Sequence, residues 1–213
     1  MKLKLALFLV LTSFQCSFST AGTIYSNLAG PQNWVVQTVV WWDDVQIVGG
    51  GKLTKVRFYG QQNSTINNVP RTYATSIEFH LFDEATGLPN GPSLGRIQAS
   101  SATPMRQGEI RLIESADLSS LNIHIPTNAR LGVAFHQDHN VAVRLYGPPK
   151  VGSSSNTLWK GLPPVAERAP VRWSNIGLEL EVVPEPQNFQ LLVTAACAIA
   201  TIYRREWFHH RMA

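Results

Sequence analysis

The chain has 213 residues, with 18 Lys and Arg against 14 Asp and Glu, which gives a formal net charge of +4. Residues 22–182 carry 13 basic and 12 acidic residues, a net charge of +1, because five basic residues lie in the termini: Lys2, Lys4, Arg204, Arg205 and Arg211. No Lys- or Arg-rich block lies in 22–182, which argues against a nucleic-acid partner. The same range contains no Cys, which excludes disulfides and a thiol nucleophile there.

The first 21 residues have the layout of a secretory signal peptide. Lys2 and Lys4 precede a short apolar run at 5–11, and small residues end at Ala21. The run is too short to be interpreted first as a membrane span. Cys16 follows Gln15 where lipid attachment requires a small residue, so a lipoprotein signal is not favoured. We expect cleavage after Ala21.

The middle of the chain predicts short strands and no long helix. Runs of β-branched, aromatic or alternating residues occur at 34–42, 52–60, 75–83, 108–115, 129–137, 141–147 and 175–183. Turn-forming residues separate them, at 48–52, 87–95 and 147–156. Strands at this spacing predict an all-β, antiparallel two-sheet sandwich forming one domain over residues 22–182.

The alternation is clearest at 75–83. Ile77, Phe79 and Leu81 fall on one face of a strand, while Glu78 and His80 fall on the other. A short amphipathic helix is the alternative, and the β-branched content of the runs disfavours it.

Acidic residues near predicted strand ends are candidate calcium ligands. Asp43 and Asp44 form one pair, and Asp83 and Glu84 lie near Asn90. Calcium takes about six to eight oxygen ligands in irregular geometry, which loops of a sandwich can supply. The preferred alternative is that Asp and Asn cap turns by bonding their own backbone. We therefore predict no cofactor, with calcium as the open alternative.

Aromatic residues offer a second candidate site. Trp41 and Trp42 precede the Asp43–Asp44 pair, and indole faces can stack on sugar rings. Alternation puts the two indoles on opposite faces of an apolar strand, so burial on both faces is the alternative. Candidate ligand-binding residues are therefore Trp41, Trp42, Asp43, Asp44 and Asp83.

Metal and catalytic motifs are weak. His136 and His139 have zinc-ligand side chains but converge only if a turn begins near Asp138, and His80 and His124 are further ligands by residue type alone. No metal site is predicted. The chain contains no Gly-x-Ser-x-Gly or His-Glu-x-x-His motif, and its acids identify no hydrolase pair. We predict that the protein is not an enzyme.

Near the C-terminus, residues 189–203 form an uncharged, largely apolar run of 15 residues. A helix of this length rises about 22 Å, which is short for a hydrocarbon core about 30 Å thick. A buried core helix is the alternative, but only ten residues follow to pack around it. We expect a single transmembrane helix whose following Arg204 and Arg205 remain in the cytoplasm.

The tail as a whole resembles a known sorting signal. Val183-Pro184-Glu185-Pro186, the apolar run, and then Arg204-Arg205 are similar to the PEP-CTERM tail of Gram-negative bacteria. The resemblance implies that residues 183–213 are a temporary anchor, cut near the motif by an exosortase-type membrane protease. It departs in its low glycine content and in Glu206, which interrupts the basic cluster. An ordinary single-pass anchor is the alternative.

A looser resemblance covers under half of the domain. The segments WWDDVQIVGGGKLTKVRFYG and IEFHLFDEATGLPNGPSLG are similar to jelly-roll-like domains of PEP-CTERM proteins. Together the resemblances imply an exported, non-enzymatic surface or matrix protein, associated with exopolysaccharide, that is anchored in the inner membrane and then released. A carbohydrate-binding lectin-like module and an extracellular hydrolase are the alternatives.

Overall fold

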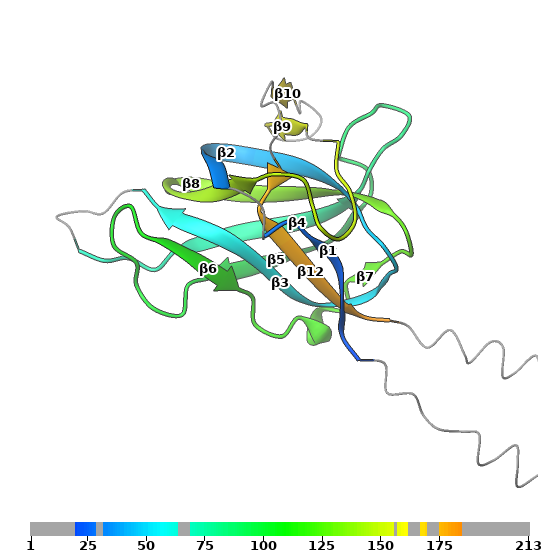
Figure 1. Ribbon diagram of the computed structural model, residues 1–213, viewed down its shortest axis with the longest axis horizontal. Helices are drawn as coiled ribbons and strands as arrows, with labels where there is room; N and C mark the ends of the chain where they lie inside the picture. Colours follow the sequence, from blue (N-terminus) through cyan, green and yellow to red (C-terminus); the bar gives the residue numbers. More distant parts are fainter. Residues whose placement is uncertain are drawn as a thin grey trace, which may run out of the picture. The chain divides into compact units, whose positions relative to one another are not determined.

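The computed structural model describes residues 20–28, 32–63, 69–155, 157–161, 167–169 and 175–184. Within these ranges the chain is all-β, with one short 3-10 helix, η1 (Ser119–Leu121), and no α-helix (Figure 1). The strands are β1 (Gly22–Ser26), β2 (Gln32–Gln46), β3 (Gly51–Gln62), β4 (Ala74–Leu81), β5 (Ser93–Ser100), β6 (Ile110–Glu114), β7 (His124–Ile125), β8 (Arg130–Tyr146), β9 (Leu158–Lys160), β10 (Glu167–Ala169), β11 (Asn175–Ile176) and β12 (Leu178–Val183). The predicted fold class is confirmed at this level.

The strands pair antiparallel and form two sheets that are joined through β8. One sheet has the order β5–β4–β8–β2–β9–β10. In the other, β12 lies between β1 and β3, and β6 and β7 pair with the opposite edge of β3. The second half of β8 reaches β3 at Val141–Val143 and β11 at Leu145–Tyr146, so hydrogen bonding continues from one sheet to the other. This arrangement is consistent with a sandwich.

The strands β1, β7, β9 and β10 lie outside the predicted runs, and two further details differ from the sequence-based expectation. The strands expected at 129–137 and 141–147 form the single strand β8, so the chain does not turn back at Asp138. Instead the register with β2 shifts, with Val39 opposite Gln137 and Gln37 opposite Ala142. The segment 87–95, expected to be a loop, contains the start of β5, a strand that is difficult to detect because only Ile97 and Ala99 of its residues are buried.

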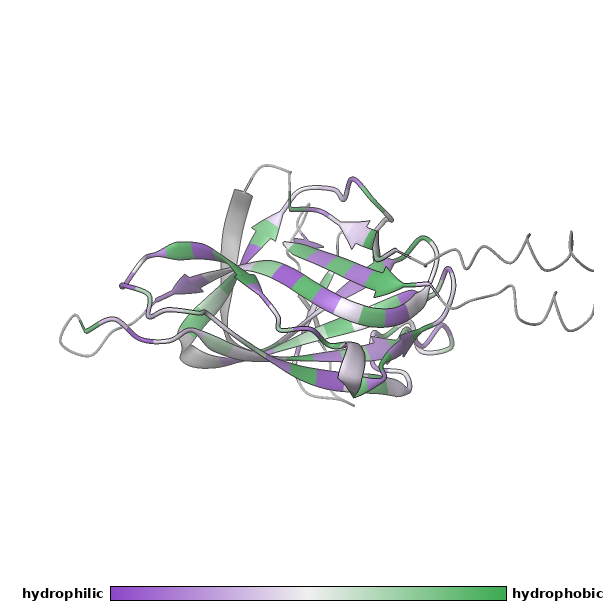
Figure 2. Cartoon of the chain, turned by 90° about the horizontal axis from the view of Figure 1, so that it is seen from below, coloured by the Kyte–Doolittle hydropathy of each residue, from purple (hydrophilic) through white to green (hydrophobic). Residues whose placement is uncertain are grey.

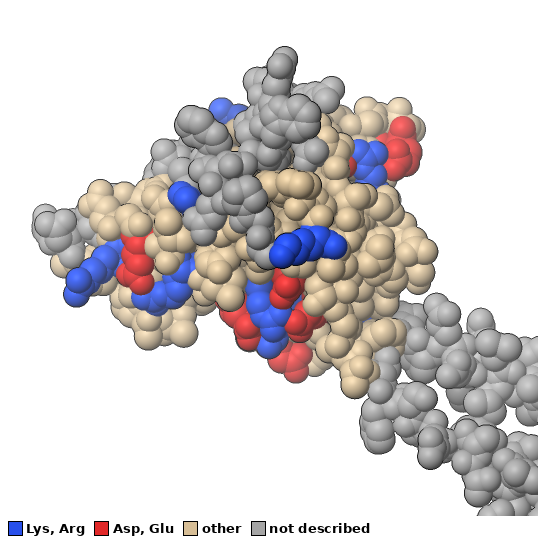
Figure 3. Space-filling view, viewed as in Figure 1, with Lys and Arg blue, Asp and Glu red and all other residues tan. Residues whose placement is uncertain are grey.

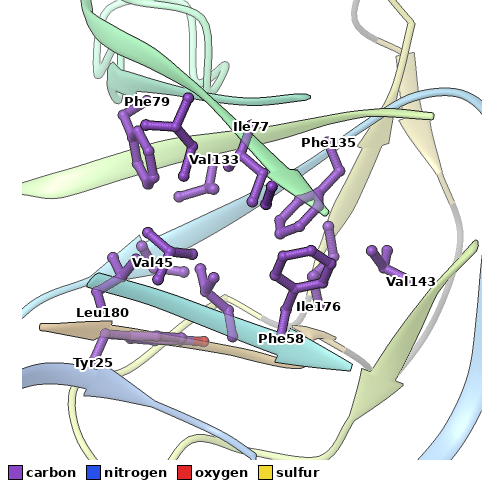
Figure 4. Close-up of a cluster of buried hydrophobic side chains, with 14 of the residues drawn as sticks. Tyr25, Val45, Phe58, Ile77, Phe79, Val133, Phe135, Val143, Ile176 and Leu180 are labelled. Atoms are coloured by element: carbon purple, nitrogen blue, oxygen red, sulfur yellow. The ribbon is translucent and has the colours of Figure 1, made fainter. Parts of the chain in front are cut away.

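The core fills the space between the two sheets. Ile77 and Phe79 on β4 are fully buried and face it, as their alternation predicts, and Figure 4 shows them opposite Phe58 and Leu180 of the other sheet. Phe58 and Phe135 meet edge to face at 5.2 Å between ring centroids. Figure 2 shows hydrophobic and hydrophilic residues alternating along the strands, the pattern expected when one face of each strand packs against the core.

A second apolar cluster lies on the opposite face of the β4–β8–β2 sheet. Its buried residues are Val40, Trp42, Phe82, Ala134 and Trp159. The segment between β4 and β5 packs over this face, with the partly buried Leu88 against the cluster and the backbone of Pro89 directly above Gly132. This part of the sheet is therefore buried on both faces.

Charged side chains cluster on the β3–β12 face. Arg57 pairs with Glu114 at 2.7 Å and Glu179 at 2.5 Å, and also with Glu181. Lys55 adds a second contact to Glu114 at 2.8 Å. Figure 3 shows acidic and basic side chains next to one another in this view. The ion pairs connect β3, β6 and β12 on the side opposite the core.

The predicted signal peptide and the predicted sorting tail lie largely outside the described residues. Val183 and Pro184 of the sorting motif are described, whereas Glu185, Pro186, the apolar run 189–203, Arg204 and Arg205 are not. In the described part of the chain, no helix has the length and apolar character needed to cross a membrane. The transmembrane helix therefore stays a prediction.

Gly132 offers a test of the loop that covers the outer face. Gly132→Ala is expected to destabilise the protein by about 1–3 kcal/mol, because the new Cβ collides with the Pro89 backbone. Gly22→Ala is the matched control, since nothing lies within 4 Å of a Cβ there. Urea unfolding of both variants measures the difference. Equal stability of the two variants would show that the 83–92 segment does not rest on Gly132.

Candidate functional site

The candidate residues Trp41 to Asp44 are consecutive on β2 and face alternate sides of the sheet. Trp41 is partly buried against the core, and Trp42 is fully buried in the outer cluster. The Trp42 indole N–H donates to the Gly161 carbonyl at 2.8 Å, and its ring meets His80 edge to face at 5.0 Å. Trp42 thus has neither an exposed face nor an unused N–H to offer a sugar, whereas Trp41 keeps some exposure.

Residues 22–182 contain three further tryptophans, Trp34, Trp159 and Trp173. Trp159 is 5% exposed and packs against Phe82 at 6.0 Å between ring centroids. The side chains of Trp34 and Trp173 lie outside the described part of the structure. The predicted aromatic platform therefore stays a prediction, with Trp41 its remaining described candidate.

Asp43 is a fully buried carboxyl group that holds together distant parts of the chain. It accepts hydrogen bonds from the Ile176 N–H at 2.6 Å and from the Ser154 hydroxyl at 3.4 Å. Burial raises the pKa of Asp43 well above its ordinary value, and the neighbouring Asp44 raises it further, while the Ile176 and Ser154 hydrogen bonds oppose the shift. This environment favours the neutral acid over the carboxylate.

Tyr25 contributes a second unusual group to the same interior. Its side chain is fully buried, and within the described residues its hydroxyl has no hydrogen-bond partner. Burial raises the pKa of Tyr25 well above its ordinary value, and the charges of Asp43 and Asp44 add to this effect. The hydroxyl therefore stays neutral. A buried polar atom without a partner costs free energy, so this position is unfavourable for stability.

Asp44 points to the other side of β2 and is paired. Both Nε and Nη2 of Arg130 donate to its Oδ2, at 3.0 and 2.7 Å, and the Ser155 hydroxyl donates to Oδ1 at 2.6 Å. The Arg130 guanidinium also lies 3.5 Å from the centroid of the Phe82 ring and 3.5 Å from Glu84. Asp44 thus fastens β2 to the segment that follows β4.

Asp83 forms the turn that the sequence suggested. Its Oδ1 accepts from the Ala85 N–H at 3.0 Å, and its Oδ2 accepts from the Thr86 hydroxyl at 2.8 Å. These hydrogen bonds, that of the Thr86 hydroxyl above all, lower the pKa of Asp83. The carboxylate is occupied by its own turn, which is the behaviour expected of an Asp in this position.

The candidate metal ligands do not converge. Asp43 and Asp44 face opposite sides of one strand, and each is already bound as described above. Across the described ranges, no group of three or more His, Cys, Asp or Glu side chains is placed to hold a metal ion. The side chain of His139 lies outside the described part, so its pairing with His136 stays untested.

The structure brings together a polar cluster that sequence analysis did not identify. Glu78 lies between two imidazoles, with Oε1 at 3.1 Å from His80 Nε2 and Oε2 at 3.2 Å from His136 Nε2. The His80 Nδ1 lies 2.7 Å from the Gly91 carbonyl oxygen, which fixes a proton on Nδ1. Burial lowers the pKa of His136, with Arg96 contributing, while Glu78 opposes the shift. The carboxyl group of Glu78 and the two imidazoles can take up protons, and they can form hydrogen bonds with polar groups of a ligand.

Alternation along β4 indicated that Glu78 and His80 share a face. The third member comes from the pairing of β4 with β8, which puts Ser76 opposite His136. The sequence contains no local signal for that contact between strands far apart in the chain.

No protein-family model matches the chain, and no curated protein matches its sequence.

The raised pKa of Asp43 predicts a pH dependence of stability. Because the folded state holds this pKa above the unfolded value of about 3.9, the contribution of protonated Asp43 is complete below that pH and is lost as the pH rises through the folded pKa. Asp43→Asn keeps the acceptor for the Ile176 N–H without the charge. Its unfolding free energy should therefore rise relative to wild type as the pH increases.

Urea unfolding of both proteins across acid to neutral pH measures this difference. Asp44→Asn removes the neighbouring charge that raises the pKa of Asp43, so it should weaken the pH dependence, and the weakened contact to Arg130 should destabilise the protein by about 1–3 kcal/mol at neutral pH. If the difference in unfolding free energy between Asp43→Asn and wild type stays constant with pH, the raised pKa of Asp43 is contradicted.

Proposed function

We propose that this is an exported, non-enzymatic surface or extracellular-matrix protein, anchored by a C-terminal transmembrane helix and sorted through a PEP-CTERM tail. The observation that carries the proposal is the position of the fold between the predicted signal peptide and the predicted sorting tail. Strand β1 begins at Gly22, next to the predicted signal-peptide cleavage site, and β12 ends at Val183, where the motif begins. Removal of residues 1–21 and of the residues beyond Pro184 leaves every described strand intact.

The placement of β12 supports a cut on the C-terminal side of Val183. This strand pairs with β1 on one edge and with β3 on the other. Its residues Leu178, Leu180 and Val182 are buried in the core. A cut within the strand would remove these side chains, whereas a cut at or beyond Pro184 removes none of them. The domain is therefore suited to release by cleavage near the motif.

The proposal extends to the type of sandwich and to the partner. We assign a jelly-roll-like arrangement, with the β5–β4–β8–β2 sheet facing the β1–β12–β3 sheet. The partner class is exopolysaccharide, as the resemblance of the tail implies. Final delivery is to the cell surface or the extracellular matrix.

A carbohydrate-binding module is the second candidate. The cluster of Glu78 and His136 favours it, since the two side chains are 24% and 19% exposed and provide hydrogen-bonding groups on an outer sheet face. Trp42, one of the two indoles considered for stacking on a sugar, is buried, which weakens this candidate. Binding of the released domain to polysaccharide, reduced by Glu78→Gln, would favour it.

Processing of the tail tests the main proposal. In a host that carries an exosortase, we expect a mature form that lacks the residues beyond the Pro184-Glu185-Pro186 motif and is found outside the inner membrane. In the same host without the protease, the full tail should remain in the membrane. Intact-mass analysis of each cell fraction distinguishes the two forms.

A variant with Pro184→Ala, Glu185→Ala and Pro186→Ala is the matched control, and it should stay membrane-bound in both hosts. Full-length wild-type protein retained in the membrane of both hosts would contradict sorting. It would leave a plain anchored domain.

A further inference from the structure

The start of β1 and the end of β12 lie at the same end of the fold. Gly22 is opposite Val182 in the β1–β12 pair, and Figure 1 shows β1 starting beside the end of β12. On the next strand Val183 is opposite Lys52, and Lys52 is in turn opposite His124 of β7. This end also includes the β2–β3 turn, because Gly50 packs against the Ile125 and Thr127 backbone.

Two exposed apolar side chains lie at this end. Val48, in the β2–β3 turn, and Leu121, in η1, are each 50% exposed. Both belong to ordered backbone, since the Val48 N–H donates to the Ile24 carbonyl at 3.0 Å and the Leu121 N–H donates to the Leu118 carbonyl at 2.9 Å. η1 is fixed beside β3 by the hydrogen bond from the Leu118 N–H to the Thr54 carbonyl at 2.9 Å.

The length of the connecting chain limits how far this end can lie from a membrane. Pro184 is the last described residue, and the predicted membrane run begins at Phe189. Even fully extended, these five steps span only about 17 Å. The interfacial layer on each side of the hydrocarbon core is about 5–8 Å thick. If residues 189–203 span the bilayer as predicted, the end of β12 lies within a short distance of the lipid headgroups.

We propose that the end of the domain that carries Val48 and Leu121 rests on the bilayer surface while the tail is in place, with both side chains in the interfacial layer. The proposal rests on the anchoring function proposed above. The transfer of exposed aliphatic side chains from water into the headgroup boundary lowers the free energy. The contact orients the domain, so that the Pro184-Glu185-Pro186 motif faces a protease in the membrane.

Site-specific fluorescence on the full chain tests this contact. The domain contains no native cysteine, and in a Cys197→Ser background, after signal-peptide removal, Val48→Cys or Leu121→Cys provides a single labelling site. An environment-sensitive dye is attached, and the protein is reconstituted into phosphatidylethanolamine–phosphatidylglycerol vesicles that contain quencher-bearing lipid. We expect blue-shifted emission and loss of fluorescence at both positions.

Leu112→Cys is the matched control. Leu112 is 41% exposed, but it lies opposite Tyr59, seven residues along β3 from Lys52 and so about 23 Å away. Its dye should keep its emission. Quenching at Val48 and Leu121 no greater than at Leu112 would overturn the proposal. Protection of both dyes only when an exosortase is present, without lipid quenching, would assign this end to the protease instead.

A label on native Cys197 separates this proposal from the one on which it depends. Lipid quenching at Cys197 without quenching at Val48 or Leu121 shows an inserted tail and a domain held off the bilayer, which refutes the surface contact alone. Absence of quenching at Cys197 refutes the membrane anchor and the surface contact together.

Discussion

Strand β12 lies between the first strand of the domain and β3, and the other features of the fold depend on this placement. The chain reaches β12 through Gly177, where Asn27 spans the break from β11 by donating to the Ile176 carbonyl at 2.8 Å and accepting from the Leu178 N–H at 2.6 Å. Ile176 immediately precedes Gly177, and its N–H donates to the buried Asp43 carboxyl group. The sheet is thus completed only when the last described residues are in place, and this places Gly22 opposite Val182, next to the two predicted processing points.

The part of the β4–β8–β2 sheet around Trp42 is buried on both faces, and this explains the behaviour of the candidate residues. On the inner side, Asp43 is enclosed by the core and favours its neutral form. On the outer side, Arg130 connects Asp44 to the segment after β4, and Trp42 is covered. Residues whose types indicate ligand binding are therefore occupied mainly in holding the strands and loops together. Partly exposed polar side chains lie further along the same sheet, at Glu78 and His136.

Local patterns predicted what depends on neighbouring residues in the chain. Alternation in 75–83 assigned Ile77 to the core and Glu78 to the other face, and turn chemistry explained Asp83. Strand β5 was missed because its sequence is polar and half exposed. The contacts of Asp44 with Arg130 and of Glu78 with His136 depend on which strands pair, and residue types do not specify pairing between distant strands. The polar cluster was therefore not predictable from this one sequence.

The role of β12 is tested most directly by two truncations of the chain. One ends at Pro184 and retains β12, and the other ends at Gly177 and lacks it. Urea unfolding followed by circular dichroism should show a single cooperative transition for the chain that ends at Pro184 and none for the chain that ends at Gly177. Cooperative unfolding of the shorter chain at the same midpoint would contradict the account, because the fold would then be complete without its last strand.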